Sequence, residues 1–269
     1  MKLKYCLGIK IIEMIFIKGD NMGIVNRNGI NFRELVLVDK IKECEDIISF
    51  YFKDKEGQQL PMHKPGQFLP FQIQTEDSNY KGVMRTYSLS MVPNESTYRI
   101  SIKKVPNGLI SSYLHEKLEI GDIIEAMNPA GIFTIKENFK NKPLVLISAG
   151  IGITPLLSMF YEESKKRSDI HFVQAVQNSS IHPFKNDIEN ICKFRNLSNT
   201  VFYSNPLESD KEGENYDFKG RIEKQWIKNN LPLDADFYFC GPPAFMKGIE
   251  NSLLDLGVDK ERINYELFS

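Results

Sequence analysis

Leu144-Val-Leu-Ile-Ser-Ala-Gly-Ile-Gly-Ile-Thr-Pro155 is an apolar run that leads into a glycine-containing turn. A continuous apolar run is typical of a parallel strand that is covered on both faces. Strand and helix patterns alternate from here onward, with strands predicted at 144–147, 170–176, 200–204, 236–240 and 263–268 and helices at 155–166, 183–194, 222–229 and 244–256. This alternation predicts an α/β domain with a doubly wound parallel sheet over residues 142–269.

Residues 32–137 follow a different pattern. Turn-forming residues separate short segments rich in β-branched and aromatic residues, at 35–38, 47–52, 68–74, 86–91, 98–104 and 123–127. Tyr98, Ile100 and Ile102 alternate with polar residues, which is the period of a half-buried strand. Together with one helix expected at 109–118, these segments predict a closed antiparallel β-barrel with Greek-key connections. The polar stretch 136–142 marks the boundary between the two predicted domains.

The composition excludes several classes of partner. Lysine and arginine total 34 and aspartate and glutamate total 35, so the net charge of −1 offers no general attraction to nucleic acid or to an anionic membrane. The longest apolar stretch, Cys6–Ile17, is interrupted by Lys10 and Glu13, and it is shorter than the about 20 residues that a membrane span needs. We therefore expect neither a nucleic-acid partner nor a membrane span.

Cysteine and histidine give no sign of a metal site. The cysteines are far apart in the sequence: Cys6, Cys44, Cys192 and Cys240. This spacing excludes local zinc, C-x-x-C and iron–sulfur motifs and favours reduced thiols in a cytoplasmic protein. The histidines also lack the spacing of metal ligands, and we expect surface or strand positions for them: His63, His115, His171 and His182.

Residues 1–31 are expected to form an N-terminal extension. Lys18-Gly-Asp-Asn21 stands directly before Met22, and codons for Lys-Gly-Asp can contain the purine tract that positions a bacterial ribosome. We hypothesise that translation naturally begins at Met22. The intact mass of protein made from its native gene tests this, and a species that begins at Met1 would contradict it.

The glycine turn has the features of a diphosphate site. Gly150 and Gly152 allow a ligand to approach the backbone closely. Thr154 is expected to cap the following helix, and Pro155 suits the first turn of that helix. The free N–H groups at such a helix start favour a diphosphate. The pattern is G-x-G-x-T-P rather than the dinucleotide fingerprint G-x-G-x-x-G, so an ordinary strand-to-helix turn is the alternative.

Arg85-Thr-Tyr-Ser-Leu-Ser90 opens a strand of the predicted barrel. Arg85 and Tyr87 share one face of this strand, and Thr86 and Ser88 share the other. An arginine can hold a diphosphate, an aromatic ring can pack on a flat heterocycle, and a hydroxyl can reach a ring nitrogen. The alternative is an ordinary edge strand with one exposed arginine.

Two further motifs lie near the end of the chain. Phe239-Cys-Gly-Pro-Pro-Ala244 runs from a strand into a helix. It places Cys240 at the carboxyl end of a parallel strand, where open α/β sheets bind ligands, although a buried cysteine before a turn is the alternative. The last residues, Asn264-Tyr-Glu-Leu-Phe-Ser269, are aromatic for a terminus, and we expect them to dock onto the protein.

Taken in order, these motifs resemble the ferredoxin–NADP reductase-like family of flavin oxidoreductases, and most closely the reductase module of flavohaemoglobins. The resemblance covers residues 32–268 and includes Lys64-Pro-Gly-Gln-Phe68, Ile110-Ser-Ser-Tyr-Leu-His115, Pro129-Ala-Gly-Ile-Phe133 and Arg262-Ile-Asn-Tyr-Glu266. That family joins an FAD-binding β-barrel to a pyridine-nucleotide domain. The resemblance implies an NAD(P)H-dependent, FAD-containing oxidoreductase that passes electrons to a separate acceptor, which is a globin, an oxygenase, another redox protein or a small acceptor.

The resemblance also implies a set of site residues. The implied cofactor-binding residues of the barrel are Phe68, Arg85, Thr86, Tyr87, Ser88, Lys103, Gly108 and Ser111. Those of the second domain are Gly150, Gly152, Thr154, Pro155, Cys240, Gly241, Pro242 and Phe268. The implied catalytic residues are Ser88 near flavin N5, Cys240 on the nicotinamide side and Glu266 beside the flavin ring.

The acceptor and the nucleotide are open at this point. Residues 1–31 are too few for a globin, so we expect no haem domain. The alternatives are a free-flavin or ferredoxin reductase and a non-catalytic flavin electron-transfer subunit of a larger complex. NADP specificity usually needs a cation beyond the third strand. Here Tyr203-Ser-Asn-Pro206 is followed by no cation before Lys211, which favours NADH over NADPH.

Overall fold

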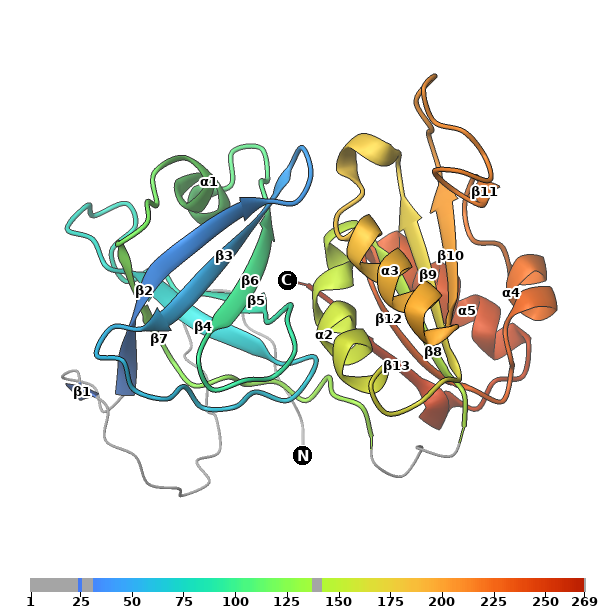
Figure 1. Cartoon of the computed structure of the whole chain (residues 1–269), viewed down its shortest axis with the longest axis horizontal. Helices are drawn as coiled ribbons and strands as arrows, with labels where there is room; N and C mark the ends of the chain where they lie inside the picture. Colours follow the sequence, from blue (N-terminus) through green and yellow to red (C-terminus); the bar gives the residue numbers. More distant parts are fainter. Residues whose placement is uncertain (1–23, 26–30, 137–141, 269) are drawn as a thin grey trace.

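The computed structural model describes residues 24–25, 31–136 and 142–268, which form two sheets (Figure 1). Each sheet has its own hydrophobic core. The expected start at Met22 and residues 137–141 of the expected domain boundary lie outside the described residues.

The N-terminal sheet is antiparallel throughout. Its strands are β1 (Ile24–Val25), β2 (Asn31–Lys42), β3 (Ile47–Asp54), β4 (Phe68–Ile73), β5 (Arg85–Ser88), β6 (Tyr98–Lys103) and β7 (Ile123–Ala126). They pair in the order β5-β4-β7-β2-β3-β6, with β1 beside β2, and α1 (Leu109–Glu116) lies between β6 and β7. A bridge between Leu89 and Ile100 joins the two ends of this order. The predicted antiparallel barrel is therefore confirmed.

The C-terminal sheet is parallel in every pair. Its strands are β8 (Leu144–Ala149), β9 (Ile170–Val176), β10 (Ser198–Tyr203), β11 (Phe218–Lys219), β12 (Asp236–Cys240) and β13 (Ile263–Glu266). The helices are α2 (Ile153–Glu163), α3 (Lys185–Arg195), α4 (Lys224–Asn230) and α5 (Pro243–Asp255). The strand order β11-β10-β9-β8-β12-β13 reverses direction between β8 and β12, which confirms the doubly wound prediction.

The apolar run of β8 is buried along its whole length. Leu144 and Leu146 pack in the cluster that contains α2 and α3, whereas Val145 and Ile147 pack in the cluster that contains α4 and α5. Both faces of the strand are thus covered by helices, as the run predicts.

Strand β6 differs from its prediction as a half-buried strand. Tyr98, Ile100 and Ile102 face the barrel core as expected, but Arg99 and Ser101 on the opposite face are also buried. The α/β domain covers that polar face, since the rings of Tyr161 and Phe184 lie within 6 Å of the Arg99 guanidinium. The alternation is therefore real, but its polar face is an interface between domains rather than a solvated surface.

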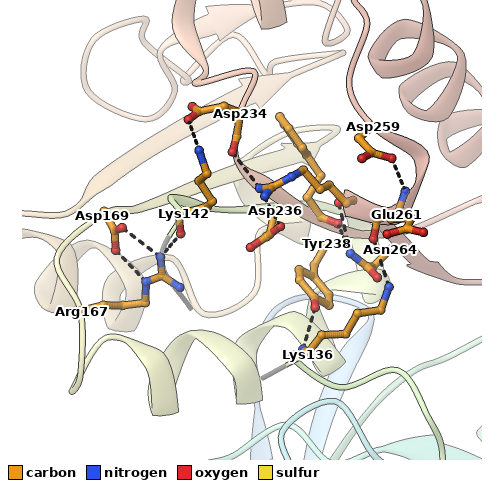
Figure 2. Close-up of polar contacts among 12 residues, drawn as sticks. Lys136, Lys142, Arg167, Asp169, Asp234, Asp236, Tyr238, Asp259, Glu261 and Asn264 are labelled. Atoms are coloured by element: carbon orange, nitrogen blue, oxygen red, sulfur yellow. Dashed lines mark hydrogen bonds and ion pairs between the residues drawn. The ribbon is translucent and has the colours of Figure 1, made fainter. Parts of the chain in front are cut away.

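A polar cluster lies at the amino ends of the parallel strands, the end of the sheet opposite the glycine turn (Figure 2). Lys136 donates its backbone N–H to the Tyr238 hydroxyl at 2.9 Å, and Lys142 pairs with Asp234 at 3.0 Å. Buried Asp236 pairs with Arg262 at 3.2 Å, and burial raises the pKa of the Asp236 carboxyl despite this partner. Both residues that flank the segment between the domains are thus attached to the β12–β13 end of the sheet.

Candidate functional site

A cavity of about 630 Å³ opens at the carboxyl ends of β8, β9, β10 and β12. Its walls include Gly150 after β8 and Pro242 after β12. The barrel also contributes, through Asp46, Ile47 and Lys103. The cavity therefore lies where the strand order reverses and where the two domains meet, which is the place where open α/β sheets bind ligands.

The two glycines of the turn are required for different reasons. Gly150 has a φ of +54°, and a Cβ added there would meet nothing within 4 Å, so its open side faces free space. Gly152 has an ordinary helical φ of −60°. A Cβ added to Gly152 would lie 2.6 Å from the Gly241 nitrogen and closer still to the Cys240 carbonyl. Gly152 thus allows the turn to pack directly against the end of β12.

The expected helix cap by Thr154 is wrong. A 3-10 turn at Gly150–Gly152 runs straight into α2, so the helix begins at Ile153, before Thr154 is reached. The Thr154 hydroxyl donates to the Ile151 carbonyl at 3.0 Å, and no side chain caps the helix. Buried Thr154 and Pro155 therefore shape the turn, and the first N–H groups of α2 have no side-chain acceptor.

The ends of β12 and β13 lie side by side, with Cys240 opposite Glu266. The buried Cys240 thiol donates to the Glu266 carbonyl oxygen at 3.3 Å, and burial raises the thiol pKa. Burial also raises the pKa of the Glu266 carboxyl to about 7. Leu267 and Phe268, which follow β13, are exposed, so the expected docking of the chain end is not seen in the described residues. A Cβ added to Gly241 would lie 2.8 Å from the Cβ of Ala149, so only glycine fits at this position without a shift of its neighbours.

Strand β5 brings the barrel candidates together. Arg85 and Thr86 are exposed, Tyr87 is half-buried and Ser88 is buried. The Tyr87 ring packs against a core phenylalanine ring with centroids 5.6 Å apart. Phe68 is the residue paired with Ser88 across the strands. The Arg85 guanidinium donates to the Met84 carbonyl at 2.7 Å, and the described residues give it no carboxylate partner.

The start of α1 and the end of β6 hold the remaining candidates. Gly108 is the N-cap of α1, and an added Cβ would collide with the Ser111 hydroxyl. The Ser111 hydroxyl accepts from the Val105 N–H at 3.2 Å, which fixes the loop before the helix. Lys103 pairs with Asp46 at 3.0 Å, and both residues line the cavity.

The surface or strand positions expected for the histidines are wrong for His63 and His182, which are buried. The two ring nitrogens of His182 lie 2.9 Å from the Tyr203 hydroxyl and 3.0 Å from the Gln174 side-chain oxygen. Burial lowers the pKa of His182 to about 3. It is therefore a neutral residue of the domain interior.

Sequence reasoning missed two cations of the cavity, Arg221 and Lys224. They follow β11, a strand of two residues whose pattern is too short to read from sequence. Lys224 pairs with Asp255 at 2.9 Å. In the described part of the chain, no group of three or more metal-ligating residues comes together, and no helix is long and apolar enough to span a membrane.

Comparison with known proteins agrees with this two-part organisation. Residues 34–135 match the model of the oxidoreductase FAD-binding domain family, and residues 146–251 match that of the oxidoreductase NAD-binding domain family. A flavohemoprotein of Bacillus cereus (strain ATCC 10987 / NRS 248) is 41% identical over 248 residues, which are 88% of this chain and 61% of the relative. A flavohemoprotein of Bacillus subtilis (strain 168) is 38% identical over 240 residues, 88% of this chain and 59% of the relative. The chain thus spans about three fifths of these curated relatives.

Among solved structures, the flavohem-like FAD/NAD-binding domain of nitric oxide dioxygenase from Vibrio cholerae O1 biovar El Tor superposes with a TM-score of 0.80. It is 32% identical, and the match covers 88% of this chain and 98% of that domain. The ferredoxin reductase in carbazole 1,9a-dioxygenase shares the fold, with a TM-score of 0.76 at 20% identity, over 91% of this chain and 71% of that one. The chain therefore belongs to the ferredoxin–NADP reductase-like family of FAD- and NAD-binding oxidoreductases and is homologous to the reductase module of flavohaemoproteins.

Proposed function

We propose that this oxidoreductase takes electrons from NADH and passes them through FAD to a separate acceptor. The observation that carries the proposal is the cavity, whose walls combine the carboxyl ends of the parallel strands with Asp46, Ile47 and Lys103 of the barrel. Bound NADH supplies the hydride and bound FAD supplies the ring that accepts it. The residues of this chain hold and orient the two groups.

The barrel surface at β5 fits FAD. The exposed Arg85 guanidinium has no carboxylate partner among the described residues and is free to hold a diphosphate. The start of α1 carries no acidic residue in its first turn, so the N–H groups that follow the N-cap Gly108, through Ser111, are assigned to the diphosphate, while the Gly108 N–H itself donates to the Val105 carbonyl at 2.9 Å. We assign Phe68 and Tyr87 to packing against the flavin ring and the Ser88 hydroxyl to a hydrogen bond near its reactive nitrogen, with exposed Thr86 beside them.

The turn between β8 and α2 fits the nucleotide diphosphate. The open side of Gly150, at the start of the 3-10 turn that leads into α2, provides a place for an anion, and neither this turn nor the first turn of α2 carries an acidic residue. We assign the ends of β12 and β13, with Gly241, Pro242 and Phe268, to the nicotinamide side. There the raised pKa of Cys240 keeps its sulfur a neutral thiol, and Glu266 can hold a proton near neutral pH.

The preference for NADH is supported by the end of β10, where Ser204 lines the cavity and the turn through Pro206 carries no cation. Arg221 lines the same cavity and provides the matched test. We expect kcat/KM to be higher for NADH than for NADPH, with the ratio unchanged in Arg221→Ala. A much higher kcat/KM for NADPH that falls selectively in Arg221→Ala would contradict this preference.

The proposed acceptor is a separate redox protein. A globin is the first candidate, because the similar curated proteins are flavohemoproteins. We place the reaction in the cytoplasm, where the free thiols of Cys44, Cys192 and Cys240 stay reduced. Steady-state NADH oxidation by FAD-loaded protein, with a globin, a ferredoxin or free flavin as acceptor, tests the proposal. Fastest turnover with the globin supports the proposal. Turnover with free flavin alone contradicts the proposal that the acceptor is a redox protein. NADH that stays unoxidised until a partner subunit is added contradicts the enzyme role.

A further inference from the structure

Arg99 is a buried cation at the junction of the two domains, with 7% of its surface exposed. On the barrel side its Nε donates to the Ser90 hydroxyl at 3.1 Å, and its Nη2 donates to the Ser90 carbonyl. The backbone carbonyl of Arg99 accepts from the Ser90 N–H at 2.9 Å. Ser90 lies two residues after Ser88, so Arg99 holds the chain that leaves β5, the strand assigned to FAD.

The same guanidinium faces the α/β domain. It lies 5.6 Å from the ring centroid of Tyr161 on α2 and 5.2 Å from that of Phe184, directly before α3. Both distances are within the range of a cation–π contact. Since α2 follows the Gly150–Gly152 turn, Arg99 joins the FAD strand to the helix that begins at the nucleotide turn.

The backbone conformation of Phe184 indicates that the fold holds its contact with Arg99 in place. Phe184 has a φ of +59°, in the left-handed region that bulky residues rarely adopt, and its side chain is buried. Such a conformation persists only where the surrounding structure holds it. Here it places the phenyl ring against Arg99. Tyr161 is held as well, because its hydroxyl donates to Asp187 at 3.1 Å.

The same region contains two more contacts across the junction. The Ser158 hydroxyl, one turn before Tyr161 on α2, donates to the Met91 carbonyl at 2.7 Å. The Glu45 N–H donates to the Ser180 carbonyl at 3.0 Å. Ser158 makes its contact through a neutral hydroxyl. Arg99 instead uses a planar guanidinium, which has several donors in a fixed geometry and a flat face that stacks on rings; a lysine side chain provides neither.

We propose that Arg99 is a positioning residue for hydride transfer, because it fixes β5 against α2 and thereby sets the spacing between the two bound cofactors. This inference rests on the proposed function. Arg99 touches neither cofactor site itself and acts through Ser90 and Tyr161. A displacement of about 1 Å between reacting groups can slow a reaction about a hundredfold, so a small shift at this junction is sufficient to matter.

Arg99→Lys tests the proposal, with Arg33→Lys as the matched control. Arg33 makes its hydrogen bonds within the barrel, to Asp54 at 2.8 Å and to the Gln59 carbonyl at 3.0 Å. In FAD-loaded Arg99→Lys we expect the rate of flavin reduction by NADH to fall about tenfold or more. The Glu45 amide should exchange its hydrogen faster in the same variant. FAD affinity should stay within about twofold of wild type, and Arg33→Lys should change neither the rate nor the exchange.

Tyr161→Leu removes the ring and provides a second variant if Arg99→Lys does not fold. Slow reduction and fast Glu45 exchange should appear in it too, and the double variant should be no slower than the slower single variant. A wild-type rate, or a slow rate with unchanged Glu45 exchange, in either variant overturns the positioning role. If wild-type protein binds FAD and dithionite reduces it while NAD(P)H does not, the proposed function fails. The exchange measurement then still decides whether Arg99 holds the domains together.

Discussion

Gly152→Ala is expected to disrupt nucleotide binding without disturbing the barrel. The added methyl group would lie 2.6 Å from the Gly241 nitrogen and closer still to the Cys240 carbonyl. Ordinary van der Waals contact begins near 3.4 Å. The atoms in the way belong to the backbone of a central strand end, so they cannot rotate aside as a side chain does. The turn and the end of β12 must therefore separate by about 1 Å.

Two magnitudes follow from this displacement. Overpacking of this kind costs about 1–3 kcal/mol of stability. A shift of about 1 Å at a site that orients reactants lowers the rate by up to about a hundredfold. We therefore expect kcat/KM for NADH to fall about ten- to a hundredfold. FAD affinity should be unchanged, because the barrel core is a separate cluster.

Stopped-flow reduction of FAD-loaded protein over a range of NADH concentrations measures this effect, and FAD fluorescence measures the flavin affinity. Gly57→Ala is the control, since an alanine there is strained by the φ of +74° rather than by a collision, and an added Cβ meets nothing within 4 Å. The control should lose stability and keep kcat/KM. If folded Gly152→Ala reduces its flavin with wild-type kcat/KM, the assignment of this turn to the nucleotide is wrong.

Three further changes test the other assigned residues. Arg85→Ala removes a charge-assisted contact worth about 1.5–3 kcal/mol, so FAD should bind about ten- to a hundredfold more weakly in a fluorescence titration; unchanged affinity would contradict the assignment. Ser88→Ala should retain FAD but slow its reduction by NADH at least about tenfold in stopped flow, and a wild-type rate would remove Ser88 from the reaction. Burial raises the pKa of Glu266 from 4.5 to about 7 in the folded protein. Between pH 4.5 and 7 the folded protein therefore keeps a proton on Glu266 that the unfolded chain releases. The contribution of Glu266 to the free energy of unfolding falls as the pH rises through this range. The Tm of Glu266→Gln relative to wild type should therefore increase across that range in calorimetry, and a constant difference would refute the shifted pKa.

Local patterns in the sequence predicted the two sheets well. Successive residues of a strand point to opposite faces, so the continuous apolar run of β8 indicates that both faces are covered. Leu144 and Val145 do pack into different clusters. Strand β6 was harder to read. Its polar face looks solvated in the sequence, and only the packing of Tyr161 and Phe184 shows that Arg99 is enclosed.

The candidate site was predictable where a motif is local and not where its cause is a distant contact. Arg85 to Ser88 form one strand, which overlaps the strand predicted at 86–91 but ends three residues earlier. Gly152 is different, since its requirement for glycine comes from the Cys240 carbonyl and Gly241, which are far away in the sequence. Thr154 is a residue type that often caps helices. Here the preceding 3-10 turn starts the helix before Thr154, and the Thr154 hydroxyl donates to the Ile151 carbonyl instead.

The central claim is that NADH reduces FAD within this protein. The most direct measurement is anaerobic titration of the FAD-loaded protein with NADH, followed by the visible absorption of the flavin. We predict complete bleaching with one NADH consumed per bound FAD, in a reaction that needs no other protein. Bound FAD that dithionite bleaches but that neither NADH nor NADPH bleaches would contradict the account.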